Sequence, residues 1–399
     1  MIKFEEALNI VLKEAVTLGT ERVELIKSTG RVLAEDIFSD LDMPPFDKSA
    51  MDGYACRAKD LQSNLVEGVV PITLQMIETI PAGKIPEKTI NAGQCSKIMT
   101  GAMLPEGADH VVMVEDTEPV DEQHIRITNA LKGPNICRKA EDIKNGDLVI
   151  RKGEILTPAH IAVLAAVGAV NPRVTTLPRV GIISTGDELV EPDFKPQRSQ
   201  IRNSNAWQIM AQAFQVPVNP YYLGIANDNA MSLREIIEKA LEESDVVLLT
   251  GGVSMGDFDY VPEILNQAGV NILFKSIAIQ PGKPTLFGRK KNQFLFGLPG
   301  NPVSSFVLFE MLVKPFLLRL MGSTAIPPTL EMTMGLDFSK KNSVRKFMMP
   351  VIIKGGQVFP IEYHGSAHIN AYTSANGILI MEIGTTEIKK GEKVHVRPL

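Results

Sequence analysis

Apolar residues recur with two different periods along this chain, and the period changes near residue 179. From about residue 55 to residue 140, short β-like runs broken by glycine and proline follow one another. This spacing predicts a small inserted β-domain. From residue 179, aliphatic runs alternate with stretches of helical periodicity. The alternation predicts a mostly parallel, doubly wound sheet with helices on both faces. After Pro327-Pro328 the pattern is β-like again.

The chain is therefore expected to be an α/β multidomain protein. We predict an N-terminal α+β region over 1–177, an α/β domain over 178–325 and a small C-terminal β-domain over 326–399. An apolar stripe predicts a helix over 3–18, Thr157-Pro158 starts another that ends near Gly168, and Gly355-Gly356 and Asn145-Gly146 predict hairpin-type turns. In the α/β domain we predict strands at 179–184, 218–223, 245–249, 272–279 and 294–296, and helices at 205–214, 232–243, 260–267 and from 302.

Composition narrows the class of protein. Of 399 residues, 44% are hydrophobic and 22% charged, and the net charge of −5 argues against a nucleic-acid partner. Three cysteines without a C-x-x-C pair argue against a disulfide framework or structural zinc and fit a reducing cytoplasm. The first residues lack the apolar stretch of a signal peptide, and the longest apolar segment, 302–321, contains charged residues and proline. We expect a cytoplasmic protein without a membrane span.

Three glycine-containing segments each follow a short aliphatic run. They are STGDE at 184–188, TGGVSMGD at 250–257 and LPGNP at 298–302. Glycine lets a ligand approach backbone N–H groups, and a helix start adds unpaired donors and a positive dipole end. Carboxylates of Asp187, Glu188, Asp257 and Asp259 stand beside these segments. Because ligands of such sheets bind at the carboxyl ends of the strands, we predict a site there for a phosphorylated ligand and a hard cation.

Several motifs resemble one family, the molybdopterin molybdenumtransferases (MoeA and the E-domain of gephyrin). The matching segments, in family order, are PPFDKSAMDGYA (44–55), IMTGA (98–102), PEGAD (105–109), RKAEDI (138–143), STGDEL (184–189), TGGVS (250–254), PGKP (281–284) and LPGNP (298–302). They extend from residue 44 to residue 302 of the 399 residues. The resemblance implies a MoaB/MogA-like molybdopterin-binding domain at the centre of the chain.

The resemblance also implies the last step of molybdenum cofactor biosynthesis. Adenylylated molybdopterin and molybdate are the substrates, AMP is released with the help of Mg²⁺, and molybdenum is left on the pterin dithiolene. It implies a homodimer whose site is shared between subunits. Other proteins of the cofactor pathway are possible partners, whereas the net charge and the lack of a membrane span predict neither nucleic acid nor membrane as a partner.

The residues expected to act in this reaction fall into groups. Those matched to catalytic positions are Asp52, Thr100, Asp142, Glu188, Asp228 and Asp259, of which Glu188 and Asp259 are the expected Mg²⁺ ligands. Those expected to bind the pterin nucleotide are Ser184, Thr185, Gly186, Thr250, Gly251, Gly252, Ser254, Pro281, Gly282, Pro299, Gly300, Asn301 and Pro302. Asn301 and Pro302 also suit the N-cap and first turn of a helix. The resemblance places Asp52, Thr100 and Asp142 in trans, and their individual roles stay open.

Molybdate is a tetrahedral dianion, so its pocket should offer cations, hydroxyls and amides. Gln280, Lys283, Arg345 and Ser366 match the oxyanion positions of the family. Gln280 is a departure, because the family commonly has lysine there. A neutral amide lacks the charge-assisted part of the hydrogen bond, about 1 kcal/mol. Gln280 could result in weaker molybdate binding, altered anion preference or local compensation. The sequence does not distinguish molybdate from tungstate as the substrate.

Two other functions remain as alternatives. The protein could be a non-catalytic paralogue that binds the pterin or the finished cofactor as a scaffold, with Gln280 marking a lost oxyanion site. The α/β domain could also serve another nucleotide hydrolysis, since that fold hosts several chemistries. His364 and His368 lie in a β-rich, glycine-containing segment that disfavours a helical metal pair, and Trp207 on a predicted helix is interpreted as a packing residue.

Overall fold

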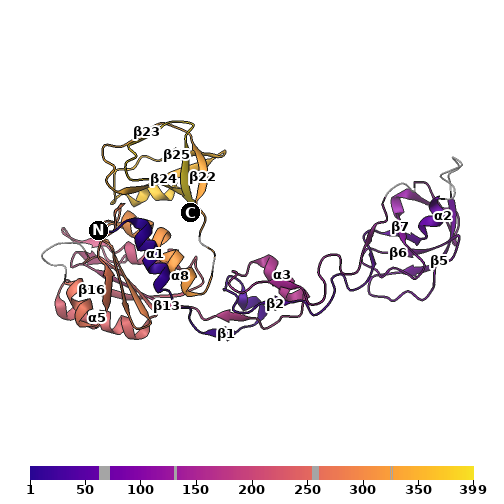
Figure 1. Cartoon of the computed structure of the whole chain (residues 1–399), viewed down its shortest axis with the longest axis horizontal. Coiled ribbons are helices and arrows are strands. Elements are labelled where there is room, and N and C mark those ends of the chain that lie inside the picture. Colours follow the sequence, from indigo (N-terminus) through magenta and orange to yellow (C-terminus); the bar gives the residue numbers. More distant parts are fainter. Residues whose placement is uncertain (63–71, 130–132, 254–259, 324, 326) are drawn as a thin grey trace. The chain divides into compact units, whose positions relative to one another are not determined.

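A computed structural model describes residues 1–62, 72–129, 133–253, 260–323, 325 and 327–399 (Figure 1). The chain divides into two compact units. The first comprises Met1–Glu35, Lys152–Ile161 and Val170–Leu399, and the second comprises Asp36–Arg151 and Ala162–Ala169. Within the described ranges, no helix has both the length and the apolar character that crossing a bilayer requires.

A six-stranded sheet forms the centre of the first unit. Its strand order is β16 (Asn219–Ala226), β13 (Arg179–Thr185), β17 (Val246–Thr250), β21 (Gln293–Leu298), β20 (Leu286–Lys290) and β18 (Asn271–Phe274). The first four strands are parallel, and β20 and β18 continue the sheet antiparallel. The prediction of a mostly parallel sheet is confirmed.

Two strands differ from the sequence prediction. Strand β20 is not among the predicted strands, and the single strand expected over 272–279 is wrong. Its first part is β18, whereas its end is β19 (Ile279–Gln280), which pairs with a strand of the C-terminal domain. Local strand propensity does not show which sheet a strand joins. The sequence therefore contains no sign that the two ends of this segment belong to different sheets.

Helices cover both faces of this sheet (Figure 1). They are α1 (Phe4–Glu14), α4 (Asn205–Ala213), α5 (Ala230–Glu243), α6 (Val261–Gln267), α7 (Pro302–Leu308) and α8 (Lys314–Leu320), with a π-helical turn (Phe309–Val313) between the last two. Side chains alternate along β13, so Ile182 packs in the cluster that contains α1, α4, α7 and α8, whereas Ile183 packs with α5 and α6. The first helix ends at Glu14, short of the predicted residue 18, where β-branched Val16 and Thr17 follow.

The C-terminal domain is a small closed barrel. Strands β24 (Lys346–Lys354), β25 (Gln357–Pro360), β22 (Leu330–Met334), β28 (Lys393–Pro398) and β26 (Gly377–Met381) pair in that order, and β26 also pairs with β24. Strands β23 (Phe338–Ser339) and β27 (Glu387–Ile388) form a separate pair, and a 3₁₀ turn covers Ile369–Thr373. Gly355 and Gly356, at φ +56° and +75°, make the predicted hairpin turn between β24 and β25.

Further short elements are two strand pairs, a 3₁₀ turn and a helix whose residues are divided between the two units. Strand β1 (Thr20–Arg22) pairs with β12 (Arg173–Thr175), β14 (Leu189–Val190) pairs with β15 (Ile201–Arg202), and Leu25–Ser28 is a 3₁₀ turn. Helix α3 (Pro158–Ala166) begins after Thr157 as predicted and is followed by Gly168 at φ +72°. This left-handed glycine ends the helix.

The second unit contains the inserted β-domain. Its six-stranded sheet has the order β7 (His110–Met113), β4 (Gly53–Cys56), β6 (Gln94–Ile98), β5 (Ile72–Ile80), β9 (His124–Ile127) and β8 (Thr117–Pro119). Helix α2 covers Ala58–Gln62, and a 3₁₀ turn covers Val114–Asp116. Strands β2 (Ile37–Phe38) and β3 (Lys48–Ser49) pair with β11 (Leu148–Ile150) and β10 (Ile136–Cys137). The turn at Asn145-Gly146 therefore leads into β11, but it does not join two paired strands.

Candidate functional site

The three glycine segments meet at the carboxyl ends of β13, β17 and β21. Gly251 has φ +90°, and a Cβ on it would lie 2.5 Å from the carbonyl oxygen of Thr185. A Cβ on Gly300 would lie 3.8 Å from Cα of Gly251. The first two segments are thus in backbone contact, and the third lies against the second. Only glycine fits at position 251 without moving the chain.

A buried group of hydroxyls lies behind the first two glycine segments. Ser184 Oγ donates to Asn203 Oδ1 at 3.0 Å and lies 3.2 Å from Thr250 Oγ1. Thr185 is 4% exposed, yet its hydroxyl has no hydrogen-bond partner among the described residues. Buried polar groups are nearly always satisfied, so a lone hydroxyl between two glycine loops suits a ligand oxygen.

The third segment begins helix α7. Asn301 is the N-cap residue, but its side chain makes no capping bond within the described residues, so the predicted side-chain cap is wrong. The first turn closes through the backbone instead, because Ser304 N–H donates to the Asn301 carbonyl at 3.0 Å. Asn205 Nδ2 donates to the Gly300 carbonyl at 2.7 Å, and Asn205 Oδ1 is buried and has no hydrogen-bond partner in the described part of the chain. The start of α4 therefore supports this loop and adds a second unsatisfied oxygen.

Carboxylates surround the first glycine segment. Asp187 Oδ1 accepts from the N–H of Asp228 at 3.0 Å, which joins the end of β13 to the segment after β16. A Cβ on Gly186 would lie 2.5 Å from Glu188 Oε2, so the glycine lets that carboxylate fold back over the backbone. Asp187 and Glu188 are exposed. Ser254, Asp257 and Asp259 lie outside the described residues.

These carboxylates suit Mg²⁺ better than a metal that needs a complete protein cage. Over the described part of the chain, no group of three or more His, Cys, Asp or Glu side chains could hold a metal ion. Mg²⁺ is usually held by one or two carboxylates together with water and substrate phosphates. The oxygen donors of Asp187, Glu188 and Asp228 fit such a partial set.

Gln280 lies in a cationic environment. Lys340 Nζ donates to Gln280 Oε1 at 3.4 Å, and Arg345 Nη1 donates to the Ile279 carbonyl at 3.3 Å. Burial and, after it, the nearby Arg345 lower the pKa of Lys340. Neither cation has a carboxylate within salt-bridge distance in the described ranges, whereas Lys346 is paired with Glu382 at 2.7 Å. Two cations without acidic partners beside an amide form a setting for an anion.

The other two predicted oxyanion residues are placed differently. The Ser366 carbonyl accepts from Val303 N–H at 3.1 Å, so the C-terminal domain contributes a loop beside the start of α7. The Lys283 carbonyl accepts from Ile277 N–H at 3.0 Å, and its side chain is exposed. Pro281 and Gly282, which follow Gln280, are both buried. No hydrogen bond between described residues joins Ser366 directly to Gln280 or Arg345.

The second unit contains the remaining predicted residues. Asp52 Oδ1 accepts from both the N–H and the hydroxyl of Thr100, at 2.6 and 2.7 Å. These two bonds lower the pKa of Asp52, the backbone bond more than the hydroxyl bond. Asp142 lines a separate cavity of about 410 Å³ with Pro44 and Lys48. The structure therefore pairs Asp52 with Thr100, and in the described residues no hydrogen bond joins Asp142 to them.

Comparison with known proteins identifies the family. Family models match in chain order: the MoeA N-terminal region (domain I and II) over residues 2–168, a probable molybdopterin binding domain over 181–319 and the MoeA C-terminal region (domain IV) over 332–399. A molybdopterin molybdenumtransferase of Staphylococcus epidermidis is 38% identical over 99% of this chain and 95% of its own. The chain belongs to the MoeA family.

Other relatives agree with this membership. A molybdopterin molybdenumtransferase of Staphylococcus aureus is 34% identical over 99% of this chain and 95% of its own. The crystal structure of a molybdopterin biosynthesis MoeA protein from Pyrococcus horikoshii covers 100% of both chains with a TM-score of 0.84 and 30% identity. The MoeA resemblance and the multidomain fold expected from sequence are both confirmed.

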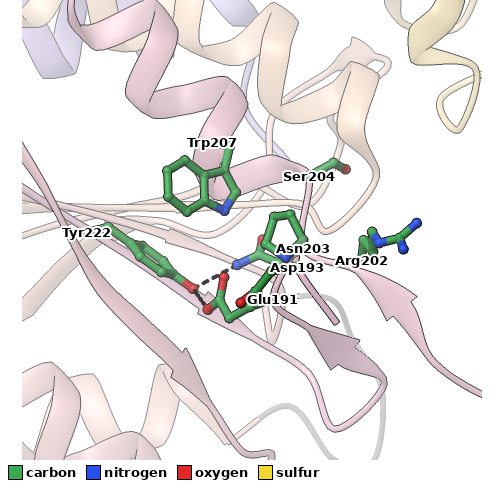
Figure 2. A pocket seen from close by; sticks show the side chains of 8 residues that line it. Glu191, Asp193, Arg202, Asn203, Ser204, Trp207 and Tyr222 are labelled. Carbon is green, nitrogen blue, oxygen red and sulfur yellow. Dashed lines mark hydrogen bonds between the residues drawn. The ribbon is translucent and has the colours of Figure 1, made fainter. Parts of the chain in front are cut away.

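Sequence reasoning missed two side chains of this MoeA-family protein and misread a third. Lys340 beside Gln280 and Asn205 beside Gly300 belong to no predicted motif. The interpretation of Trp207 as a packing residue is wrong, because its side chain is 51% exposed and lines a cavity (Figure 2). Hydrophobic periodicity identifies the helix that carries a residue, but Trp207 lies on its outer face.

Proposed function

We propose that this protein inserts molybdenum from molybdate into adenylylated molybdopterin, with Mg²⁺-dependent release of AMP. The observation that carries the proposal is the meeting of the three glycine loops beside the hydroxyl of Thr185, which has no hydrogen-bond partner among the described residues. Backbone N–H groups, a helix start and a free hydroxyl in one place suit a phosphorylated ligand. The relatives named molybdopterin molybdenumtransferases supply the identity of that ligand.

Release of AMP by hydrolysis breaks one P–O bond of the diphosphate that joins AMP to the pterin, and the oxygen of an in-line water forms the new P–O bond. Negative charge develops on the leaving phosphate oxygen, so the site must offer hydrogen-bond donors in a fixed arrangement. In this proposal the second and third loops present the backbone N–H groups of Gly252 and Gly300 to the phosphates, because the Gly251 N–H donates to the Leu298 carbonyl and Pro299 has no N–H. Ser184 and Asn205 hold these loops in place through the bonds described above.

The Mg²⁺ requirement rests on the carboxylates beside the first loop. The family match favours Glu188, in the first loop, and Asp259, which follows the second loop, as the ligands, and Asp228 is the next candidate. Mg²⁺, when bound, neutralises phosphate charge. Asp187 accepts from the backbone of Asp228 and so fixes the segment that presents Asp228.

The proposed molybdate pocket is the cationic environment of Gln280. Arg345 and Lys283 supply charge, and Ser366 supplies a hydroxyl, as the family match indicates. Lys340 adds a further cation. Its pKa is lowered by burial and by Arg345, and a bound anion would raise that pKa again. We also propose a cytoplasmic homodimer, in which Asp52, Thr100 and Asp142 act on substrate bound by the partner copy. The two bonds from Thr100 keep Asp52 ionised for such a role.

The test is AMP release measured by chromatography. The purified protein is incubated with adenylylated molybdopterin and MgCl₂, with or without molybdate. We expect AMP release that depends on molybdate and stops when EDTA removes Mg²⁺. Release no faster than in a sample without protein would reject the proposal. Tight binding of the adenylylated pterin without turnover would indicate instead a scaffold paralogue that binds the pterin without catalysis.

A further inference from the structure

A cavity of about 850 Å³ opens beside β15, α4 and the edge strand β16 (Figure 2). Its volume lies within the range of about 300–1,000 Å³ that is typical of small-molecule sites. None of the residues predicted from sequence to bind the substrate lines it. The cavity combines one aromatic wall with one polar edge.

Trp207 on α4 forms the aromatic wall. Its ring centroid lies 5.8 Å from that of Tyr222 at an interplanar angle of 47°, so the two rings are tilted and not stacked. Its side chain is 51% exposed, although tryptophan is usually well covered in a folded protein. An exposed indole at a cavity is a suitable platform for a flat ring.

The polar edge is a chain of hydrogen bonds with a defined direction. Asn203 Nδ2 donates to the Tyr222 hydroxyl at 2.8 Å, and that hydroxyl donates to Glu191 Oε1 at 2.6 Å (Figure 2). Asn203 is 1% exposed, and its Oδ1 accepts from Ser184, which fixes the orientation of the amide. Burial and then Glu191 raise the pKa of Tyr222, so its hydroxyl keeps the proton that it donates. This series of hydrogen bonds presents Glu191 as a carboxylate acceptor at the cavity.

We propose that this cavity binds the bicyclic aminopyrimidinone ring of a pterin, stacked on Trp207 with its N–H groups donating to Glu191. The ring N3–H and the 2-amino group of a pterin are adjacent donors that match a carboxylate. Adenine has one amino donor next to an acceptor nitrogen, which a carboxylate would repel. The proposal deepens the proposed function and rests on it for the identity of the substrate.

The polar edge also connects the cavity to the glycine loops. Ser184, which donates to Asn203, lies 3.2 Å from Thr250 Oγ1 at the start of the second loop. Asn205, two residues before Trp207, donates to the carbonyl of Gly300 in the third loop. A pterin in the cavity thus lies in the same network of residues as the loops proposed to bind its phosphate.

The test is binding of 6-hydroxymethylpterin and of AMP to the full-length protein, followed by calorimetry and by tryptophan emission. Trp207 is the single tryptophan of the chain, so its emission reports on this cavity alone. We expect saturable quenching by the pterin. Trp207→Ala should weaken pterin binding about tenfold or more, and Trp207→Phe, which keeps a flat ring, should weaken it less. Glu191→Gln should weaken binding of the pterin and not of AMP.

The control is Phe214→Ala. Phe214 is an exposed aromatic residue at the end of the same helix, outside the cavity, and its loss should leave pterin binding unchanged. Thermal unfolding of each variant verifies that it is folded. Unchanged pterin affinity in Trp207→Ala and Glu191→Gln would overturn the proposal, as would no pterin binding at all. Quenching by AMP but not by the pterin would assign the cavity to adenine and overturn it too.

Failure of this inference is distinguishable from failure of the proposed function. The binding measurements need no turnover, so pterin binding at Trp207 without any AMP release would leave the ring site standing and remove the reaction. If Trp207→Ala changed neither AMP release nor pterin affinity, the proposed ring site would be rejected and the proposed reaction would stand.

Discussion

The ammonium of Lys340 lies 3.4 Å from the side-chain amide oxygen of Gln280. This contact occupies the acceptor of the amide and leaves its NH₂ group available to donate. Lys340 Nζ also lies over the ring of Phe347, 3.8 Å from its centroid, which adds a cation–π contact. Of the three outcomes that Gln280 leaves open, this geometry favours local compensation, in which Lys340 supplies the charge that an amide lacks.

We expect Lys340→Ala to raise the molybdate concentration needed for half-maximal AMP release about tenfold. A charge-assisted hydrogen bond contributes about 1.5–3 kcal/mol against about 1 kcal/mol for a neutral one, and 1.4 kcal/mol corresponds to tenfold. Lys341→Ala is the matched control, because Lys341 is exposed and adjacent in sequence. Gln280→Lys added to Lys340→Ala should restore the affinity. No change in Lys340→Ala would mean that this lysine does not contribute to the pocket.

Glu188→Gln should raise the Mg²⁺ concentration required for AMP release by about tenfold or more. Loss of even a supporting residue typically costs 10–100-fold in metal affinity, and Glu188 is a proposed direct ligand. The measurement is AMP release across a Mg²⁺ titration. Glu243→Gln, an exposed carboxylate at the end of α5, is the control and should behave as the unmodified protein. An unchanged Mg²⁺ dependence would remove Glu188 from the metal site.

Thr100→Val should raise the pKa of Asp52, because the hydroxyl bond is lost while the stronger backbone bond remains. The lowered pKa of Asp52 means that its bonds contribute stability above the ordinary pKa of aspartate. That contribution is lost as the pH falls through the lowered value. Carboxyl NMR titration of labelled protein measures the shift directly. The acid limb of the pH–activity profile should move to higher pH if ionised Asp52 is required. The control is Thr100→Ser, which keeps the hydroxyl and should leave the pKa of Asp52 and the acid limb unchanged.

Gly251→Ala should destabilise the protein more than Gly355→Ala does. Both residues have positive φ, which costs a non-glycine residue about 1–2 kcal/mol. At Gly355 a Cβ meets nothing within 4 Å, whereas at Gly251 it would lie 2.5 Å from the Thr185 carbonyl oxygen. We expect about 2 kcal/mol of additional loss, measured by calorimetric unfolding, together with slower AMP release in Gly251→Ala only. Equal effects of the two changes would argue against the backbone contact between the first two loops.

Much of the fold was accessible from local patterns. The Gly355-Gly356 turn joins β24 and β25 as expected, since two adjacent glycines suit a turn with two positive φ angles. The break within the strand expected over 272–279 could not be predicted from local patterns, because the two ends of this segment join different sheets. Asn301 has the residue type of a side-chain cap, yet the backbone closes the turn and Asn205 supports the loop from another helix.

The amino-acid sequence by itself determined the family, the order of the domains and the three glycine loops. These depend on contiguous residues, whose backbone preferences and spacing are visible without a fold. Only the tertiary structure decided that Lys340 meets Gln280, that the Thr185 hydroxyl has no partner among the described residues and that Trp207 faces a cavity. Such relationships join strands, helices and loops from distant parts of the chain, and their geometry arises when the sheet and the barrel assemble.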